Sequence, residues 1–100
     1  MYLDNIRDLG WPEPLAYQHQ SSFIRQLLLA GIELNTRQAR FAGIGNLHSK
    51  ISELKRKGVP VSVRYKQAID PFTHALNPYP VLHVLMTEKQ RAAYLESLGA

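Results

Sequence analysis

The sequence predicts a mainly α-helical fold with a small antiparallel β-wing, and this prediction depends on the segment from Glu33 to Val63. Within it, apolar residues recur at helical spacing, a glycine-containing turn separates two helical stretches, and a period-two alternation follows the second stretch. The resulting order is a short strand, a helix, a turn, a second helix and a β-type segment. That is the element order of a winged helix-turn-helix.

The first helix of this segment should begin at Asn35 or Thr36, because a short side-chain oxygen can accept hydrogen bonds from the unpaired N–H groups of a first helical turn. Ala39 and Gly43 lie four residues apart, so both small residues share one helix face and allow another helix to cross closely. Gly43 also tolerates the positive φ that ends a helix. A turn through residues 43–45 follows.

The second helix should run from about residue 45 to residue 57 and end at Gly58. Leu47, Ile51 and Leu54 form one apolar stripe along it. We therefore expect this stripe to face the core and the opposite side of the helix to face solvent.

The remaining segments complete one small domain. Residues 1–17 form an N-terminal arm in which Trp11 is expected to pack into the core, and residues 18–100 form the winged helix-turn-helix domain. A helix from Gln18 or Gln20 to Ala30 should supply much of that core.

The extended wing should span about residues 59–86, with Val63 and Tyr65 on an apolar face and Arg64 and Lys66 on a basic one. Its connecting loop is long, so residues 72–76 are expected to pack back or form a helical turn. Thr87 and Gln90 have the spacing of a capping box and should start a last helix at about residues 87–98.

Composition narrows the class of protein. One hundred residues, 45% of them apolar, suffice for one modest core. There is no cysteine, hence no disulfide or thiolate metal site. No N-terminal signal is visible, and the most apolar window, residues 23–34, is too short and too charged to span a bilayer. We expect a cytoplasmic protein that contacts no membrane.

Nothing in the sequence indicates catalysis. The four histidines show no metal-ligand spacing, and the Gly43–Gly45 turn is not followed by the Gly-Lys-Ser/Thr of a phosphate loop. We therefore expect no enzyme, no catalytic residue, no metal and no cofactor.

Charge is unevenly distributed along the chain. The 30 residues from Arg37 to Lys66 hold eight cations and one anion, Glu53, for a net charge of +7. The other 70 residues hold four cations and seven anions, for a net charge of −3. Such a cationic helix pair and strand indicate a nucleic-acid partner.

The glycine, isoleucine and leucine spacing of this region resembles a family of small winged helix-turn-helix proteins found mainly in bacteriophages and prophages. The likeness covers roughly Phe23 to Val63 and is carried by Leu28, Leu29, Gly31, Thr36, Arg40, Phe41, Gly43, Ile44, Leu47, Lys50, Ile51, Glu53, Leu54, Lys55, Gly58 and Val61. The resemblance implies DNA binding or transcriptional control, in or near the nucleoid of a bacterial host cell.

The expected partner is double-stranded DNA, with the second helix in the major groove. The candidate base-reading residues are Asn46, His48, Ser49 and Ser52. The candidate phosphate-binding residues are Arg37, Arg40, Lys50, Lys55, Arg56, Lys57, Arg64 and Lys66. Glu53 either accepts a hydrogen bond from cytosine or forms an i, i+4 pair with Lys57.

Two alternatives remain open at this level. The chain is either a DNA-binding protein or a small winged module that inhibits or modulates a host protein, using Trp11, Tyr17, Phe72 or Tyr79 as contacts.

The oligomeric state is also open. A homodimer is possible, because one recognition helix reads only a few base pairs. The N-terminal arm or the last helix would supply the dimer contact.

Overall fold

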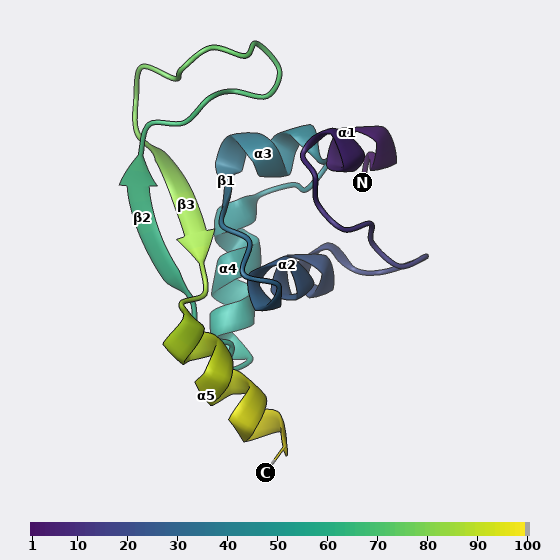
Figure 1. The fold of residues 1–100 in the computed structure, drawn as a ribbon, viewed down its shortest axis with the longest axis vertical. Coiled ribbons are helices and arrows are strands. Elements are labelled where there is room, and N and C mark those ends of the chain that lie inside the picture. Colours follow the sequence, from purple (N-terminus) through teal and green to yellow (C-terminus); the bar gives the residue numbers. More distant parts are fainter. Residues whose placement is uncertain (100) are drawn as a thin grey trace.

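The computed structural model describes residues 1–99 and contains five helices and three short strands. In chain order these are α1 (Leu3–Asp8), α2 (Gln20–Leu29), β1 (Leu34–Asn35), α3 (Thr36–Phe41), α4 (Leu47–Arg56), β2 (Ser62–Lys66), β3 (Val81–Leu85) and α5 (Glu88–Gly99) (Figure 1). The expectation of a mainly helical chain with a small antiparallel sheet is therefore confirmed.

The three strands form one antiparallel sheet in the order β1-β3-β2. Val84 of β3 lies opposite Leu34 of β1 on one side and Val63 of β2 on the other. Leu34, Leu82 and Val84 face the helices and are buried, which agrees with the alternation of side chains along a strand. The short strand predicted before α3 is thus present, and its partner in the sheet is β3.

One core joins the helices, the sheet and the N-terminal arm. The apolar face of α2, from Phe23 to Leu28, is buried against the stripe of α4. Ile6 and Trp11 of the arm belong to the same core, and the Trp11 ring lies 6.5 Å from that of Phe23. Trp11 is only 7% exposed. The expectation that it packs into the core is confirmed, so it is not available as a contact for a partner.

The predicted helix boundaries depend on side-chain caps that are present in the structure. Asn35 forms a capping box with Gln38 at the start of α3. Thr87 and Gln90 form the second capping box before α5. Gly58 follows α4 with φ +84°, the left-handed conformation that favours glycine after a helix.

The surroundings of Gly43 differ from the expectation. Its φ is +83°, as a helix end requires, but the atoms that a Cβ would meet there do not belong to the flank of another helix. Instead the first residues of the chain lie against it: the N–H of Tyr2 donates to the carbonyl of Ala42 (2.9 Å), and a Cβ on Gly43 would be 3.0 Å from Met1 Cα. The small residue is needed for the arm and not for a helix crossing.

The β2–β3 loop (residues 67–80) folds back over α3 instead of extending into solvent (Figure 1). The Phe72 ring packs edge-on against Phe41 of α3 at 5.1 Å, so the expectation that this part of the loop packs back is confirmed. Inside the loop, Ile69 pairs with Leu76 as an isolated antiparallel bridge. At the opposite end of the molecule, α5 contributes only Tyr94 to the buried core.

Candidate nucleic-acid interface

The outward side of α4 is polar and cationic. His48, Ser49, Ser52, Lys55 and Arg56 are all exposed along it. On the opposite side Leu47, Ile51 and Leu54 are no more than 4% exposed, so the apolar stripe faces the core as expected. Because the stripe fixes the rotation of the helix, these five side chains point into solvent together.

The start of α4 is set by Asn46. This residue has a left-handed backbone (φ 45°), and its Oδ1 accepts from the N–H of Ser49 (3.1 Å). The helix therefore begins at Leu47, two residues later than expected. Asn46 is exposed, but its side-chain oxygen is occupied by the cap, so only the amide nitrogen is available to a base. Ser52 Oγ donates to the carbonyl of His48 (3.1 Å).

The turn between α3 and α4 is held by a residue that the sequence analysis missed. Gln20, the first residue of α2, donates from Nε2 to the carbonyl of Gly43 (3.2 Å) and accepts at Oε1 from the N–H of Gly45 (3.1 Å). These bonds join residues 23 and 25 positions apart, so no local pattern signals them. They set the position of α3 relative to α4.

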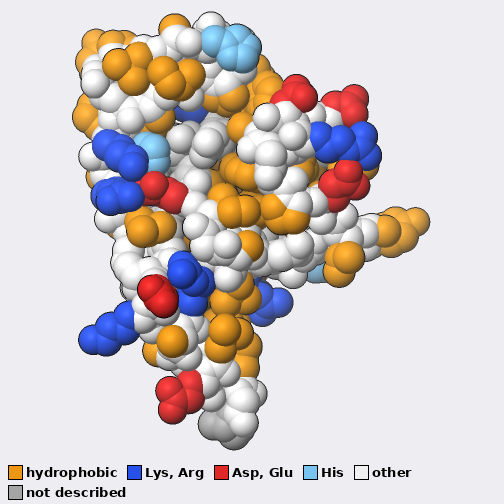
Figure 2. Space-filling model, in the orientation of Figure 1, with side chains coloured by type: hydrophobic (Ala, Val, Ile, Leu, Met, Phe, Trp, Pro, Cys, Tyr) orange, Lys and Arg blue, Asp and Glu red, His pale blue; other side chains and the backbone are white. Residues whose placement is uncertain are grey.

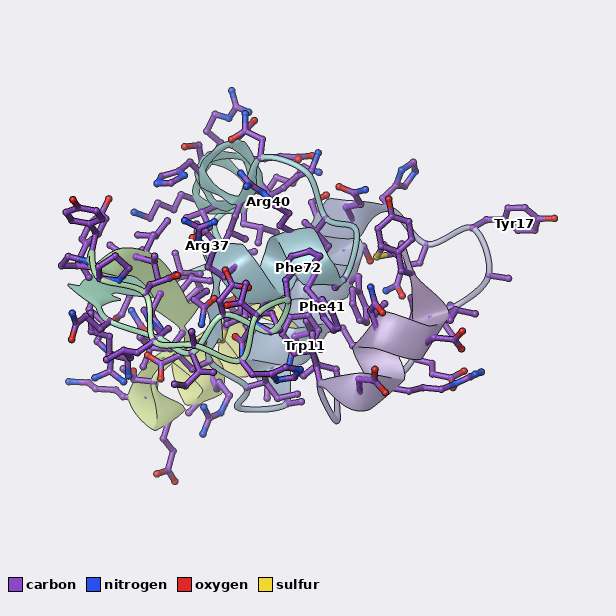
Figure 3. The ribbon with its side chains drawn as sticks, turned by 90° about the horizontal axis from the view of Figure 1, so that it is seen from above. Trp11, Tyr17, Arg37, Arg40, Phe41 and Phe72 are labelled. Atoms are coloured by element: carbon purple, nitrogen blue, oxygen red, sulfur yellow. The ribbon has the colours of Figure 1, made fainter. Side chains whose placement is uncertain are left out.

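A groove of about 450 Å³ separates the α3–α4 turn region from the sheet. It brings together Arg37 and Arg40 of α3, Asn46 and His48 at the start of α4, and Tyr65 of β2. Figure 3 shows Arg37 and Arg40 lying on the side of the molecule that carries α4. Four predicted site residues, from α3 and from the start of α4 with its cap, therefore share one concave surface.

Tyr65 is the second residue that the sequence analysis missed as a site residue. The alternation placed it on the apolar face of the wing, and Leu82, its partner in the sheet, is indeed buried. Burial nevertheless decreases along the segment that leads into β2, from 3% exposure at Val59 to 43% at Val63 and 65% at Tyr65 within the strand. The end of the strand extends past the core, so Tyr65 opens onto the groove.

Two predicted phosphate ligands on β2 are engaged by a carboxylate. Arg64 Nε lies 2.8 Å and Lys66 Nζ 3.3 Å from the two carboxylate oxygens of Glu33. The hydrogen bond from Arg64 lowers the pKa of Glu33 below its ordinary value, and Lys66 acts in the same direction. Glu33 is consequently ionised at neutral pH, and it offsets one of the two positive charges on this face of β2.

Other cations of the basic segment also face carboxylates. Lys57 Nζ lies 3.1 Å from Glu53 Oε1, so the i, i+4 pair is the observed role of Glu53. Arg37 is 4.0 Å from Asp70. The charge count along the sequence overstated how cationic the segment from Arg37 to Lys66 is in the folded protein. Glu33 and Asp70 lie outside that segment in the chain but pair with its cations.

Four predicted phosphate ligands have no ion-pair partner within residues 1–99, namely Arg40, Lys50, Lys55 and Arg56. Lys50 is separated from the others, because it lines a second cleft, of about 530 Å³, between α2 and α4. Arg40, Lys55 and Arg56 are all exposed; Lys55 and Arg56 lie on the outward side of α4, and Arg40 lies on α3. They are the cations best placed to meet a polyanion.

Beneath the ion pairs of Glu33 lies a buried histidine. His83 of β3 sits opposite Arg64 of β2 and Asn35 of β1, is 5% exposed, and has no hydrogen-bond partner at Nε2. Burial lowers the pKa of His83, and the positive charge of Lys66 lowers it further. The outer sheet face therefore holds a neutral imidazole under charged side chains.

No protein-family model, no curated protein and no solved structure matches this chain. Within residues 1–99, no three histidine or carboxylate side chains are grouped so that they could hold a metal ion. None of the helices in the same range has the length and apolar character needed to cross a bilayer.

Proposed function

We propose that the chain is a winged helix-turn-helix protein that binds double-stranded DNA, with α4 as the helix that enters the major groove. The observation that carries this proposal is the outward side of α4: its five exposed side chains include two cations and no carboxylate, while Leu47, Ile51 and Leu54 anchor the opposite side in the core. A rigid, cationic helix face of this kind fits a polyanion with readable base edges.

The exposed side chains divide into two roles. His48, Ser49 and Ser52 lie in the first half of α4, the part of a recognition helix that usually reaches base edges. Arg56 and Lys55 lie in its last turn and would contact phosphates. Arg37 and Arg40 in the groove would hold the strand next to the helix start, with Tyr65 against the sugar or a base.

The β2 strand contributes less to this proposed contact. Arg64 and Lys66 share one carboxylate, that of Glu33, so each would bind a phosphate in competition with its ion pair. Most of the electrostatic affinity is therefore assigned to α3 and α4. The resemblance to phage and prophage proteins supports a role in transcriptional control or as an accessory DNA-binding protein.

The test compares three single substitutions by duplex-binding titrations at several salt concentrations. Arg56→Ala should weaken binding to all duplexes alike and reduce the salt slope by roughly one. His48→Ala should change the sequence preference selected from a random duplex pool. Lys89→Ala removes the same charge from α5, which has no part in the proposed contact, and should leave both properties unchanged. Absence of duplex binding by the parent protein at low salt would refute the proposal.

A second candidate function, binding to a host protein, is favoured by one feature of the arm. Tyr17 is fully exposed, has φ +64° and points away from the molecule (Figure 3), and Leu15 beside it is 71% exposed. This turn is fixed, because Gln18 accepts from the N–H of Leu15 (2.9 Å) and donates to Gln26 Oε1 of α2 (3.0 Å). A rigid apolar projection of this kind is typical of protein contacts.

Capture experiments from bacterial lysate separate the two candidates. If this second function is correct, the parent chain retains a specific protein that Leu15→Ser/Tyr17→Ser does not retain, and this difference persists after nuclease treatment. Equal capture by the parent and the double variant would exclude the arm as the contact.

A further inference from the structure

The β2–β3 loop presents a surface unlike the rest of the molecule. From residue 67 to residue 87 the chain contains no lysine or arginine, although the whole protein has 12. Its only acidic residue, Asp70, is buried. Exposed in the same loop are Ile69, Phe72, Leu76 and Tyr79, at 57%, 54%, 55% and 78%. Figure 2 shows hydrophobic side chains gathered at the end of the molecule where this loop lies.

This surface is rigidly built. Asp70 Oδ1 accepts from the N–H of Phe72 (2.8 Å), and the backbone of Asp70 bonds to both His74 (2.7 Å) and Ala75 (2.8 Å). The Phe72–Phe41 contact ties the loop to α3. An apolar surface that is already ordered loses little conformational entropy when a partner covers it. The loop therefore has the properties of a docking surface and not of a mobile linker.

We propose that the β2–β3 loop is the surface through which two copies of this chain pair. Without lysine or arginine the loop contributes no cation that would release counterions from a phosphate backbone, so a nucleic acid is a poor occupant. Two molecules that each carry a formal charge of +4 repel one another through their cationic faces. The neutral loop is the surface at which identical molecules meet without that repulsion.

The size of the surface agrees with a modest dimer. The four exposed apolar side chains together present on the order of 500 Å², which is in the range of patches that mark interaction sites. With the neighbouring polar and proline residues the area approaches the roughly 800 Å² per partner of an ordinary interface. A reversible dimer is therefore expected.

The position of the loop suits a dimer that acts on one ligand. The molecule is elongated, with extents of 45 × 30 × 21 Å, and the loop lies at one end of its long direction (Figure 1). In Figure 3, which looks along that direction, α4 lies at one edge, and its buried apolar stripe turns the opposite, exposed side sideways and away from the core. A two-fold axis through the loop and parallel to that sideways direction places both α4 faces on the same side of the pair.

The test is sedimentation of the full chain over a range of concentrations at high salt, where charge repulsion is screened. We expect a monomer–dimer equilibrium in the parent. Ile69→Ser/Tyr79→Ser should weaken dimerisation roughly 30-fold, with unchanged circular dichroism. The matched control, Leu95→Ser/Leu98→Ser, removes two apolar side chains that are 55% and 63% exposed on α5 and should dimerise like the parent.

Three outcomes would overturn the proposal: a parent that stays monomeric at all concentrations, a dimer that the loop substitutions leave intact, or a dimer that the α5 substitutions dissociate. The DNA-binding proposal is tested separately, by measuring how the monomeric loop variant binds a duplex too short for two copies. If the loop variant still binds the short duplex, the DNA-binding proposal stands whatever the oligomeric state. If neither the parent nor the variant binds DNA, the DNA-binding proposal fails and the dimer proposal is unaffected.

Discussion

Glu33 forms ion pairs with Arg64 and Lys66 on β2. Removing the charge of Glu33 should show how much these two cations can contribute to DNA binding. The substitution Glu33→Gln keeps the shape of the side chain and removes the charge that holds Arg64 Nε at 2.8 Å and Lys66 Nζ at 3.3 Å. Both cations are about half exposed, so each can turn toward a bound duplex once it is released. The fold should be almost as stable as before, because exposed ion pairs contribute little.

The expected magnitude follows from counterion release. Each additional phosphate contact makes the salt slope steeper by about 0.9, so release of two cations should add roughly 1.8. Between 50 and 200 mM salt, that difference makes the loss of affinity about tenfold larger than in the parent. At the lowest salt concentration the variant should bind random duplex more tightly.

Fluorescence anisotropy with a labelled duplex, repeated at five or more salt concentrations, measures both quantities. Glu96→Gln is the matched control, because it adds the same charge on α5, where residues 1–99 provide no ion-pair partner for Glu96. An equal change in slope for both variants would mean that net charge alone acts. An unchanged slope for Glu33→Gln would show that β2 lies away from the duplex.

Three further predictions concern the scaffold. Gly43→Ala should lower the free energy of unfolding by about 2 kcal/mol, since φ is +83° and the new Cβ would meet Met1. Thermal unfolding measures this change, and Gly45→Ala is the control, because a Cβ at Gly45 would meet no atom within 4 Å. Gln20→Leu removes both side-chain hydrogen bonds to the α3–α4 turn. It should lower the free energy of unfolding by about 1–2 kcal/mol and also weaken duplex binding. If neither the stability nor the binding changes, Gln20 does not position the turn. Burial lowers the pKa of His83, so as pH falls the unfolded chain takes up a proton near the ordinary value of 6.5 before the folded chain does. Stability should therefore fall as pH decreases below 6.5. In a melting series between pH 7 and 5, His83→Leu should lack this histidine-dependent loss of stability.

Local signals predicted the helices of the central segment well. Asn35, Thr87 and Gly58 act through bonds or backbone angles within a few residues, so their effects can be read from neighbouring positions. The inward side of α4 was predictable for a similar reason, because the spacing of its apolar residues determines which side must avoid water. What such signals omit is every contact made between distant segments.

The candidate site shows the consequence most clearly. Glu33 precedes Arg64 and Lys66 by 31 and 33 residues, and Asp70 reaches back to Arg37, so a count of charges along the chain could not show that these cations are engaged. Gln20 offered no pattern at all, although it fixes the turn that positions α4. Tyr65 followed the correct alternation, but the extent of the core below β2 decided its exposure.

By itself, the sequence determined which segments become helices or strands and which side of each avoids water, because short-range sterics, capping and hydrophobic periodicity act within a few residues. Only the tertiary structure decided which charges remain available at the surface and where the apolar loop comes to lie. Electrostatic pairing and burial depend on distances in space, and the β2–β3 pairing and the packing of the arm bring together residues that the linear chain keeps far apart.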